Sequence, residues 1–162
     1  MVVPKFSRIL VPLDGSELSI KAAEYAISIA KKQGDDSGCS FLIALHVVYS
    51  STGYAYSLRL VSPSSIQNLL EKCKQEFQPW FDIIKEKASY NKNDDKTSLQ
   101  LKTDIILSTT SIVEAIIDYA EREKVDLIVI GTRGMSGFKR MVLGSVASGV
   151  VTYASCPVMV VK

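Results

Sequence analysis

The sequence predicts an α/β fold in which a five-stranded parallel sheet is covered by helices on both faces. Short runs of apolar and mostly β-branched residues, such as 9–11 and 127–130, are typical of strands buried on both faces. These runs alternate with segments whose apolar residues recur at helical spacing. Strands that alternate with helices imply parallel pairing through right-handed crossovers, and therefore a three-layer α/β/α arrangement.

The amino-terminal part is predicted to hold two strands around one helix. The apolar run at 8–13 forms the first strand, and Ser16 offers an N-cap for a helix at 17–33. The polar segment 34–38, which begins and ends with glycine, is expected to end this helix. The second strand follows at 41–48, again almost entirely apolar.

The middle of the chain is the least regular part. Residues 49–63 are rich in serine and tyrosine and predict a surface loop near the same end of the sheet. Ser62 and Pro63 place an N-cap and a first-turn proline at the start of a long helix that reaches residue 88. Pro79 predicts a kink or break within this helix.

The carboxyl-terminal part continues the alternation of strands and helices. The expected elements are a strand at 99–107, a helix at 111–124, a strand at 127–130, a helix at 146–154 and a strand at 157–161. Ser111 and Glu114 have the spacing of a capping box at the start of the first of these helices.

Length and composition bound the class of protein. The 162 residues suffice for one well-buried core, so 1–162 is expected to be a single domain. The net charge of +2, without a long basic run, argues against nucleic acid as a partner. No apolar stretch approaches a membrane span and residues 1–7 lack a signal-peptide core, so we expect a cytoplasmic protein without membrane contact. Three scattered cysteines predict reduced thiols, with Cys156 buried beside the last strand.

A glycine-rich segment joins the fourth strand to the last helix. Gly131, Gly134 and Gly137 stand at every third position, and Gly144-Ser145 precedes the helix. Glycines let the backbone approach an anion, and a helix N-terminus attracts phosphate. Turn geometry alone also explains such glycines, but Gly144-Ser145 adds a hydroxyl and an N-cap at one point. Neither a P-loop nor a G-x-G-x-x-G motif occurs in the sequence.

At these residues the chain resembles the nucleotide-binding branch of the universal stress protein family. That branch has two glycines separated by two residues and, nine residues later, a glycine followed by serine or threonine. Gly131, Gly134, Gly144 and Ser145 match this spacing without a gap. Further family signatures appear in the strand-one motif at 9–16, in His46-Val47 and in the final Cys-Pro-Val motif at 154–161. The resemblance covers the whole chain except a variable loop and helix region at about 49–98.

The resemblance implies the adenine nucleotide alpha hydrolase-like, Rossmann-like version of the fold, with strand order 3-2-1-4-5. Ligands of open parallel sheets bind beyond the carboxyl ends of the strands, where the strand order reverses. With this order, the reversal lies between the strands that end at Asp14 and Gly131. We therefore expect the binding site between these two strand ends.

Ten residues are expected to bind an adenine nucleotide: Pro12, Asp14, Val47, Gly131, Thr132, Arg133, Gly134, Gly144, Ser145 and Val146. The carboxylate of Asp14 can accept hydrogen bonds from ribose hydroxyls or an adenine amine, and it can also cap the following turn. By resemblance, Pro12 and Val47 wall the adenine and Gly131 approaches the ribose. By the same resemblance, Gly134 and residues 144–146 hold the phosphates.

Two of these residues and the only histidine carry open alternatives. Thr132 and Arg133 can reach the phosphates, although a solvated Arg133 is an equal alternative. His46 has no nearby nucleophile or carboxylate pattern to orient it, and we expect it to be structural. No catalytic residue and no protein metal ligand is assigned.

The resemblance implies a protein that binds ATP, or AMP or ADP, with Mg²⁺ held mainly through the phosphates. We expect a nucleotide-dependent switch or stress-response regulator whose loop 132–143 orders on binding. One alternative is a slow ATPase or phosphotransferase, although the loop offers no evident general base. The other is a nucleotide-independent protein-interaction module, as in the family branch that lacks the glycine motif.

The carboxyl terminus suggests an oligomer. If Val158–Val161 forms the outer strand, it presents an apolar sheet edge that only Lys162 follows. Pairing with its own copy about a two-fold axis satisfies those backbone groups. We therefore expect a homodimer through this strand, together with a protein partner that the sequence does not identify.

Overall fold

The fold is built from nine elements of secondary structure. The computed structural model describes residues 5–37, 40–49, 63–89, 99–134 and 143–162. Its strands are β1 (Arg8–Pro12), β2 (Ser40–Tyr49), β3 (Leu99–Ser108), β4 (Leu127–Gly131) and β5 (Val158–Val161). Its helices are α1 (Glu17–Ser37), α3 (Pro63–Ser89), α4 (Ile112–Arg122) and α5 (Ser145–Tyr153). The expected alternation of strands and helices is therefore confirmed.

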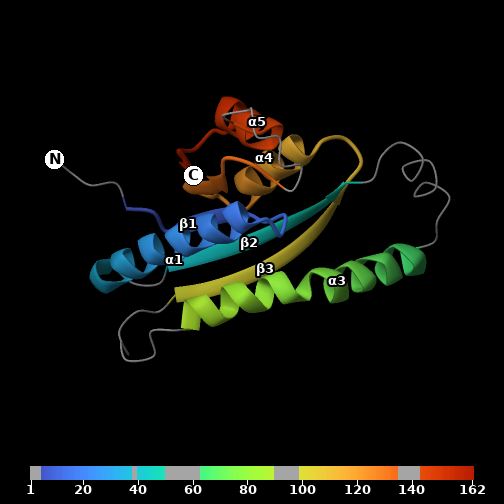
Figure 1. Cartoon of the computed structure of the whole chain (residues 1–162), viewed down its shortest axis with the longest axis horizontal. Helices are drawn as coiled ribbons and strands as arrows, with labels where there is room; N and C mark the ends of the chain where they lie inside the picture. The colour runs from blue at the N-terminus through green and yellow to red at the C-terminus, as the bar shows by residue number, and fades with distance from the viewer. Residues whose placement is uncertain (1–4, 38–39, 50–62, 90–98, 135–142) are drawn as a thin grey trace.

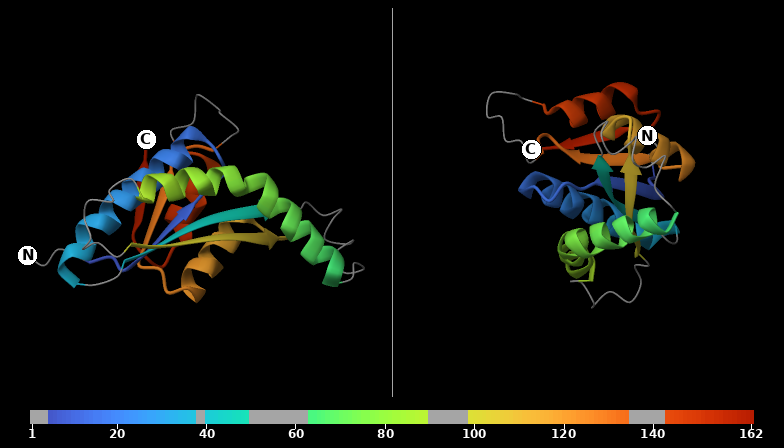
Figure 2. Two further views of the ribbon diagram at one scale, coloured as in Figure 1. Left: turned by 90° about the horizontal axis from the view of Figure 1, so that it is seen from below. Right: turned by 90° about the vertical axis from the view of Figure 1, so that its right-hand side faces the viewer.

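The five strands form one parallel sheet in the order β3-β2-β1-β4-β5, as expected. Helices α1 and α3 lie on one face of this sheet, and α4 and α5 lie on the other (Figures 1 and 2). β1 is the central strand. The chain first adds β2 and β3 on one side of β1, and then crosses back to add β4 and β5 on the other side. The strand order thus reverses between β1 and β4, at their carboxyl ends.

Two apolar cores fill the space between the three layers. Residues of α1 and α3, such as Ala26 and Ile84, pack on one face, while Ile116 of α4 and Val150 of α5 pack on the other. All five residues of β4 are buried, in agreement with the apolar run that predicted this strand. No helix within the described ranges has the length and apolarity that crossing a membrane requires.

Helix α1 is longer than predicted. Ser16 Oγ accepts a hydrogen bond from the backbone N–H of Ser19 at 3.2 Å, so the expected N-cap is confirmed. The predicted end at residue 33 is wrong, because the helix runs through Gly34 to Ser37. A single glycine inside a helix costs about 1 kcal/mol relative to alanine, which does not by itself end a helix.

Helix α3 contains Pro79 without a break. The structure shows one continuous helix, which is curved along its length in Figure 2. Pro79 is exposed, whereas Phe81 and Ile84 on the same helix are buried in the core. Burial of this apolar face compensates for the backbone hydrogen bond that proline cannot make. The predicted cap Ser62 and the loop at 50–62 lie outside the described residues.

Two local expectations in the last third of the chain need correction. The N-cap of α5 is Gly144, which makes no side-chain capping bond, and Ser145 is the first residue of the helix. Cys156 is half-buried rather than fully buried, and it packs at the margin of the core under α4 and α5. The N-cap of α4 is confirmed, because Ser111 Oγ accepts from the N–H groups of Val113 and Glu114.

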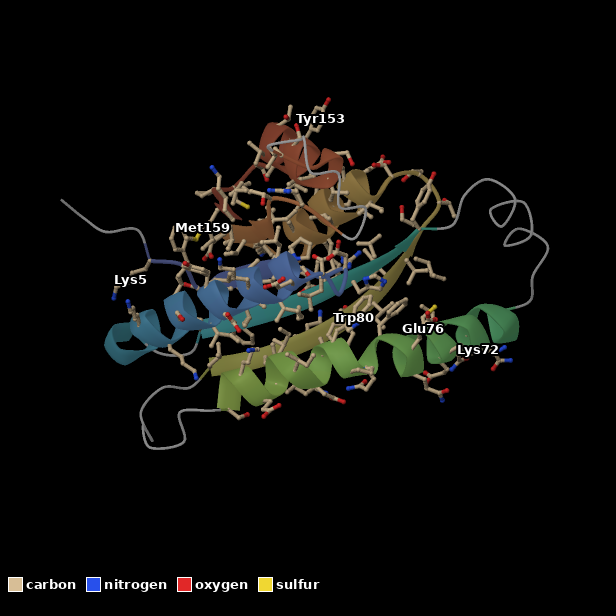
Figure 3. The ribbon with its side chains drawn as sticks, in the orientation of Figure 1. Lys5, Lys72, Glu76, Trp80, Tyr153 and Met159 are labelled. Atoms are coloured by element: carbon tan, nitrogen blue, oxygen red, sulfur yellow. The ribbon has the colours of Figure 1, made fainter. Side chains whose placement is uncertain are left out.

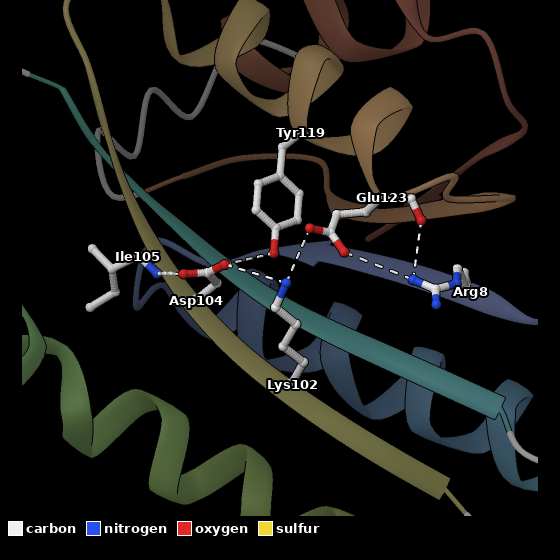
Figure 4. Close-up of polar contacts among 6 residues, drawn as sticks. All are labelled: Arg8, Lys102, Asp104, Ile105, Tyr119 and Glu123. Atoms are coloured by element: carbon white, nitrogen blue, oxygen red, sulfur yellow. Dashed lines mark hydrogen bonds and ion pairs between the residues drawn. The ribbon is translucent and has the colours of Figure 1, made fainter.

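A cluster of charged and polar side chains connects β1, β3 and α4 (Figure 4). The Tyr119 hydroxyl donates to Asp104 Oδ2 at 2.9 Å. Lys102 Nζ lies 3.1 Å from Glu123 Oε1 and 3.6 Å from Asp104 Oδ2. Arg8 donates to the backbone oxygen of Glu123 at 3.2 Å, and its Nη1 lies 3.8 Å from Glu123 Oε2. We call these five residues the polar cluster.

Candidate functional site

A pocket of about 470 Å³ lies beyond the carboxyl ends of β1 and β4. This is the position at which the strand order reverses. All ten residues that the sequence analysis expected at a binding site line this pocket. They come from β1, β2, the segment after β4 and the start of α5, so the fold gathers four separate segments into one place.

Asp14 follows β1 and presents its carboxylate to the pocket. Its Oδ1 accepts hydrogen bonds from the backbone N–H of Ser16 at 3.0 Å and from Ser16 Oγ at 2.6 Å. The turn-capping role that was weighed for Asp14 is thus present. The second oxygen, Oδ2, packs against Gly134, since a Cβ built on Gly134 would overlap it. The carboxylate thus caps its own turn through one oxygen and contacts the glycine segment through the other.

The two halves of the glycine motif lie next to each other. The backbone N–H of Gly144 donates to the carbonyl oxygen of Thr132 at 2.7 Å, which closes the connection between β4 and α5. The N–H of Thr132 in turn donates to Val161 O at 2.8 Å and extends the β4–β5 ladder. Residues 135–142 between the two halves, including Gly137, lie outside the described residues.

The amino terminus of α5 faces the pocket through Gly144, Ser145 and Val146. The first N–H groups of a helix have no acceptor within the helix, and the helix dipole adds a partial positive charge there. Ser145 is exposed and offers its hydroxyl at the same place. Arg133 is also exposed, which is compatible with either of the two roles considered for it. This side of the pocket suits an anion.

The opposite side of the pocket is apolar. Pro12 of β1, Val47 of β2 and Ile130 of β4 contribute from the sheet, and Ile112 and Ile116 contribute from α4. These residues belong to the core under α4 and α5 or border it. A flat and weakly polar group such as a nucleobase fits a chamber of this kind, with Asp14 between the chamber and the glycine segment.

Helix α3 closes a third side of the pocket with Glu76, Phe77 and Trp80. Figure 3 shows Glu76 and Trp80 one turn apart on this helix. The ring of His46 on β2 lies 4.1 Å from that of Phe77 and 5.2 Å from that of Trp80, between ring centroids. The three rings form a compact aromatic group, which we call the aromatic wall.

His46 contacts both the other rings of this wall and the turn after β1. Its Nδ1 lies 2.7 Å from the carbonyl oxygen of Leu13. Burial lowers the pKa of His46, against the opposing effects of the Leu13 carbonyl and the carboxylates of Asp14 and Glu76. The ring is therefore neutral at pH 7, and Nδ1 carries the proton because a carbonyl oxygen can only accept.

Comparison with known proteins identifies the family of the chain. The profile of the universal stress protein family matches residues 5–162, which is nearly the whole chain. The chain belongs to the universal stress protein family. One relative is a universal stress protein of Methanocaldococcus jannaschii, 33% identical over 157 residues that cover 97% of this chain and 82% of the relative. Another is the universal stress protein YxiE of Bacillus subtilis, 33% identical over 159 residues, with 97% and 99% covered.

Solved structures of universal stress proteins share the fold. The chain superimposes on UspA from Lactobacillus plantarum with a TM-score of 0.71 and 28% identity, covering 99% of this chain and 100% of the other. Two more distant structures hold nucleotides. One is a universal stress protein in complex with cAMP, with a TM-score of 0.60, 20% identity and 98% of each chain covered. The other is the Archaeoglobus fulgidus protein in complex with dAMP, with a TM-score of 0.63, 19% identity and 98% and 100% covered.

The universal stress protein motifs did not indicate the aromatic wall. Glu76, Phe77 and Trp80 fall in the region 49–98, where the family resemblance ends. Trp80 is four residues from Glu76 and three from Phe77, which indicates one helical face, yet nothing in the sequence tells which neighbour that face meets. Among the described residues, no group of three or more His, Cys, Asp or Glu side chains could hold a metal ion.

Proposed function

We propose that this universal stress protein binds an adenine nucleotide, ATP foremost with AMP and ADP as alternatives, and acts as a nucleotide-dependent switch in a stress response. One observation carries the proposal: a carboxylate, a glycine-lined backbone and a helix amino terminus meet around a single apolar pocket at the switch point of the sheet. The cAMP and dAMP complexes of structurally similar proteins support it.

The described residues fit the parts of a nucleotide. Gly134 lets the backbone approach the Asp14 carboxylate closely, because a Cβ at this position would overlap Asp14 Oδ2. The backbone N–H groups at the start of α5 would hold phosphate oxygens, and the apolar chamber would hold the base. A bound triphosphate would bring Mg²⁺, held mainly by its own oxygens.

A switch requires contacts that exist only when the ligand is bound. Phosphates held between Gly134 and Gly144 would contact both ends of the loop 132–143 and would favour one arrangement of it. Most of this loop, residues 135–142, lies outside the described residues, so its ordering on binding stays a prediction.

The test is calorimetric titration with ATP and AMP, each with and without Mg²⁺. Gly134→Val should weaken ATP binding by about 100-fold, or ~2.7 kcal/mol, because the new side chain would overlap Asp14 Oδ2 and displace the carboxylate. Gly149→Ala is the matched control: its methyl group would press on Val113 outside the pocket. This control should lower the free energy of unfolding by about 1 kcal/mol and leave ATP binding unchanged.

Two other outcomes would favour the alternative functions. Release of phosphate from ATP by the wild type, lost in Gly134→Val, would favour a slow ATPase or phosphotransferase. Absence of nucleotide binding by the wild type would contradict the proposal and favour the nucleotide-independent protein-interaction module.

The proposal includes a homodimer through β5. This strand is at one end of the sheet and pairs with β4 on its other side, and Met159 on it is 37% exposed. Such an edge invites pairing with a second copy. Val160→Lys should yield a monomer in size-exclusion chromatography with light scattering. A Val160→Lys protein that elutes with the mass of a dimer would count against this interface.

A further inference from the structure

The turn that carries Asp14 packs directly against the only tryptophan of the chain. A Cβ built on Gly15 would overlap Cε2 and Cζ2 of Trp80, both in the six-membered ring of the indole. Gly15 also has a positive φ of 79°, which non-glycine residues rarely adopt. The indole therefore lies where the side chain of any other residue at position 15 would be.

The aromatic wall holds Trp80 in this position. The Phe77 ring lies 4.8 Å from that of Trp80, and the His46 ring meets Trp80 edge-on at 5.2 Å, between centroids. His46 also donates to the carbonyl of Leu13, the residue before Asp14. Helix α3 and strand β2 thus contact the turn on both sides of Asp14, at Leu13 and at Gly15.

Helix α1 fixes the same turn from its other side. Ser16 donates to Asp14 Oδ1 through its N–H and its hydroxyl, and Asp14 N lies 3.4 Å from Ser19 Oγ. The turn is thus clamped between the amino terminus of α1 and the aromatic wall. These contacts together fix the position of Asp14 Oδ2, which lies against Gly134.

We infer that Trp80 is a positioning residue for Asp14: through its packing on Gly15, helix α3 sets where the Asp14 carboxylate faces the ligand in the pocket. Trp80 lies in the region 49–98, which departs from the family motifs. This region then shapes the site by packing on the turn, and none of its side chains has to bind the ligand. The ligand-binding consequence rests on the proposed function, whereas the effect on the turn does not.

The experiment has one arm without ligand and one with ATP. Trp80→Phe removes the ring atoms that contact Gly15 and keeps an aromatic group in the wall. In the free protein, NMR hydrogen exchange of the Ser16 amide, which donates to Asp14 Oδ1, should become about tenfold faster. Phe81→Leu is the matched control, because Phe81 is a buried aromatic residue of α3 that does not line the pocket. It should leave Ser16 exchange within about twofold of wild type.

The second arm is a double-mutant cycle with Asp14→Asn, measured by calorimetry with Mg-ATP. Trp80→Phe alone should weaken ATP binding by about tenfold, and it should add less than about twofold to the loss caused by Asp14→Asn. Non-additivity of this kind means that Trp80 acts through Asp14.

Three results would overturn the inference. Unchanged Ser16 exchange in Trp80→Phe would show that the indole does not hold the turn. An equal effect of Phe81→Leu would indicate general loosening of α3. Additive losses in the cycle would show that Trp80 binds the ligand directly. If the wild type does not bind ATP at all, the proposed function fails, and the exchange arm alone decides whether Trp80 positions Asp14.

Discussion

Two regions of this protein are each built around a carboxylate, and they differ in what surrounds it. In the polar cluster, Asp104 meets a tyrosine hydroxyl and a lysine from neighbouring elements. At the pocket, one oxygen of Asp14 caps a turn and the other packs against Gly134, where both residues line a cavity. Both carboxylates lie on the sheet or next to it.

The difference indicates how a binding carboxylate is told from a structural one. The polar cluster joins β1, β3 and α4 through hydrogen bonds and ion pairs within the protein, and these interactions stabilise the fold. Asp14 instead lines a pocket of about 470 Å³, which has room for another molecule. Both regions hold a carboxylate, but Asp14 lines this pocket and Asp104 does not.

The comparison predicts that the same substitution, Asp→Asn, weakens ATP binding at one carboxylate and lowers the free energy of unfolding at the other. Asp14→Asn should weaken ATP binding by about tenfold or more, because a neutral amide accepts weaker hydrogen bonds than a carboxylate. Asp104→Asn should lower the free energy of unfolding by about 1 kcal/mol, through a weaker bond from Tyr119, and leave ATP binding unchanged. Calorimetry and urea unfolding of both variants measure the two effects. A loss of ATP affinity in Asp104→Asn would contradict the division.

A second prediction concerns Tyr119, whose side chain is buried in the polar cluster. Burial raises the pKa of Tyr119 to about 12, with Lys102 opposing the shift and Asp104 reinforcing it. In the unfolded chain the hydroxyl ionises near pH 10. The fold therefore holds this proton more tightly, and the stabilisation that is complete below pH 10 is lost as the pH rises from 10 to 12.

Tyr119→Phe tests this sign. At pH 7 it should lower the free energy of unfolding by about 1 kcal/mol, because the hydrogen bond to Asp104 is lost. Between pH 9 and 11.5 its stability should decline less than that of the wild type, since the other tyrosines and lysines titrate in both proteins. Parallel declines in urea unfolding would show that Tyr119 is not the group that titrates.

The smallest expected effect concerns His46 at the pocket. Burial lowers its pKa, so below about pH 6.5 the unfolded chain binds a proton that the folded chain resists. The stabilisation present above pH 6.5 is lost as the pH falls. His46→Gln should therefore lose less stability than the wild type between pH 7.5 and pH 5.5. Equal losses in urea unfolding would refute the assignment.

The sequence predicted most of the fold because its signals are local. The buried strands appear as apolar runs, and Ser16 and Ser111 marked the starts of two helices correctly. One error is a local signal that packing overrode: Gly34 disfavours a helix, yet α1 runs through it. Of the kink or break expected at Pro79, the break is absent, and α3 is curved along its length (Figure 2). The strand order came from family resemblance, since no residue pattern specifies which strands are neighbours.

For the candidate site, sequence by itself determined the chemistry of the parts: Asp14 after a buried strand, glycines where a backbone must be approached, and Gly144 at a helix start. These features depend on the spacing of residues along a short stretch of chain. Tertiary structure alone decided that Gly134 faces Asp14 and that Trp80 packs on Gly15. The physical reason is that such contacts join residues more than sixty positions apart, and their geometry depends on how the helices pack on the sheet.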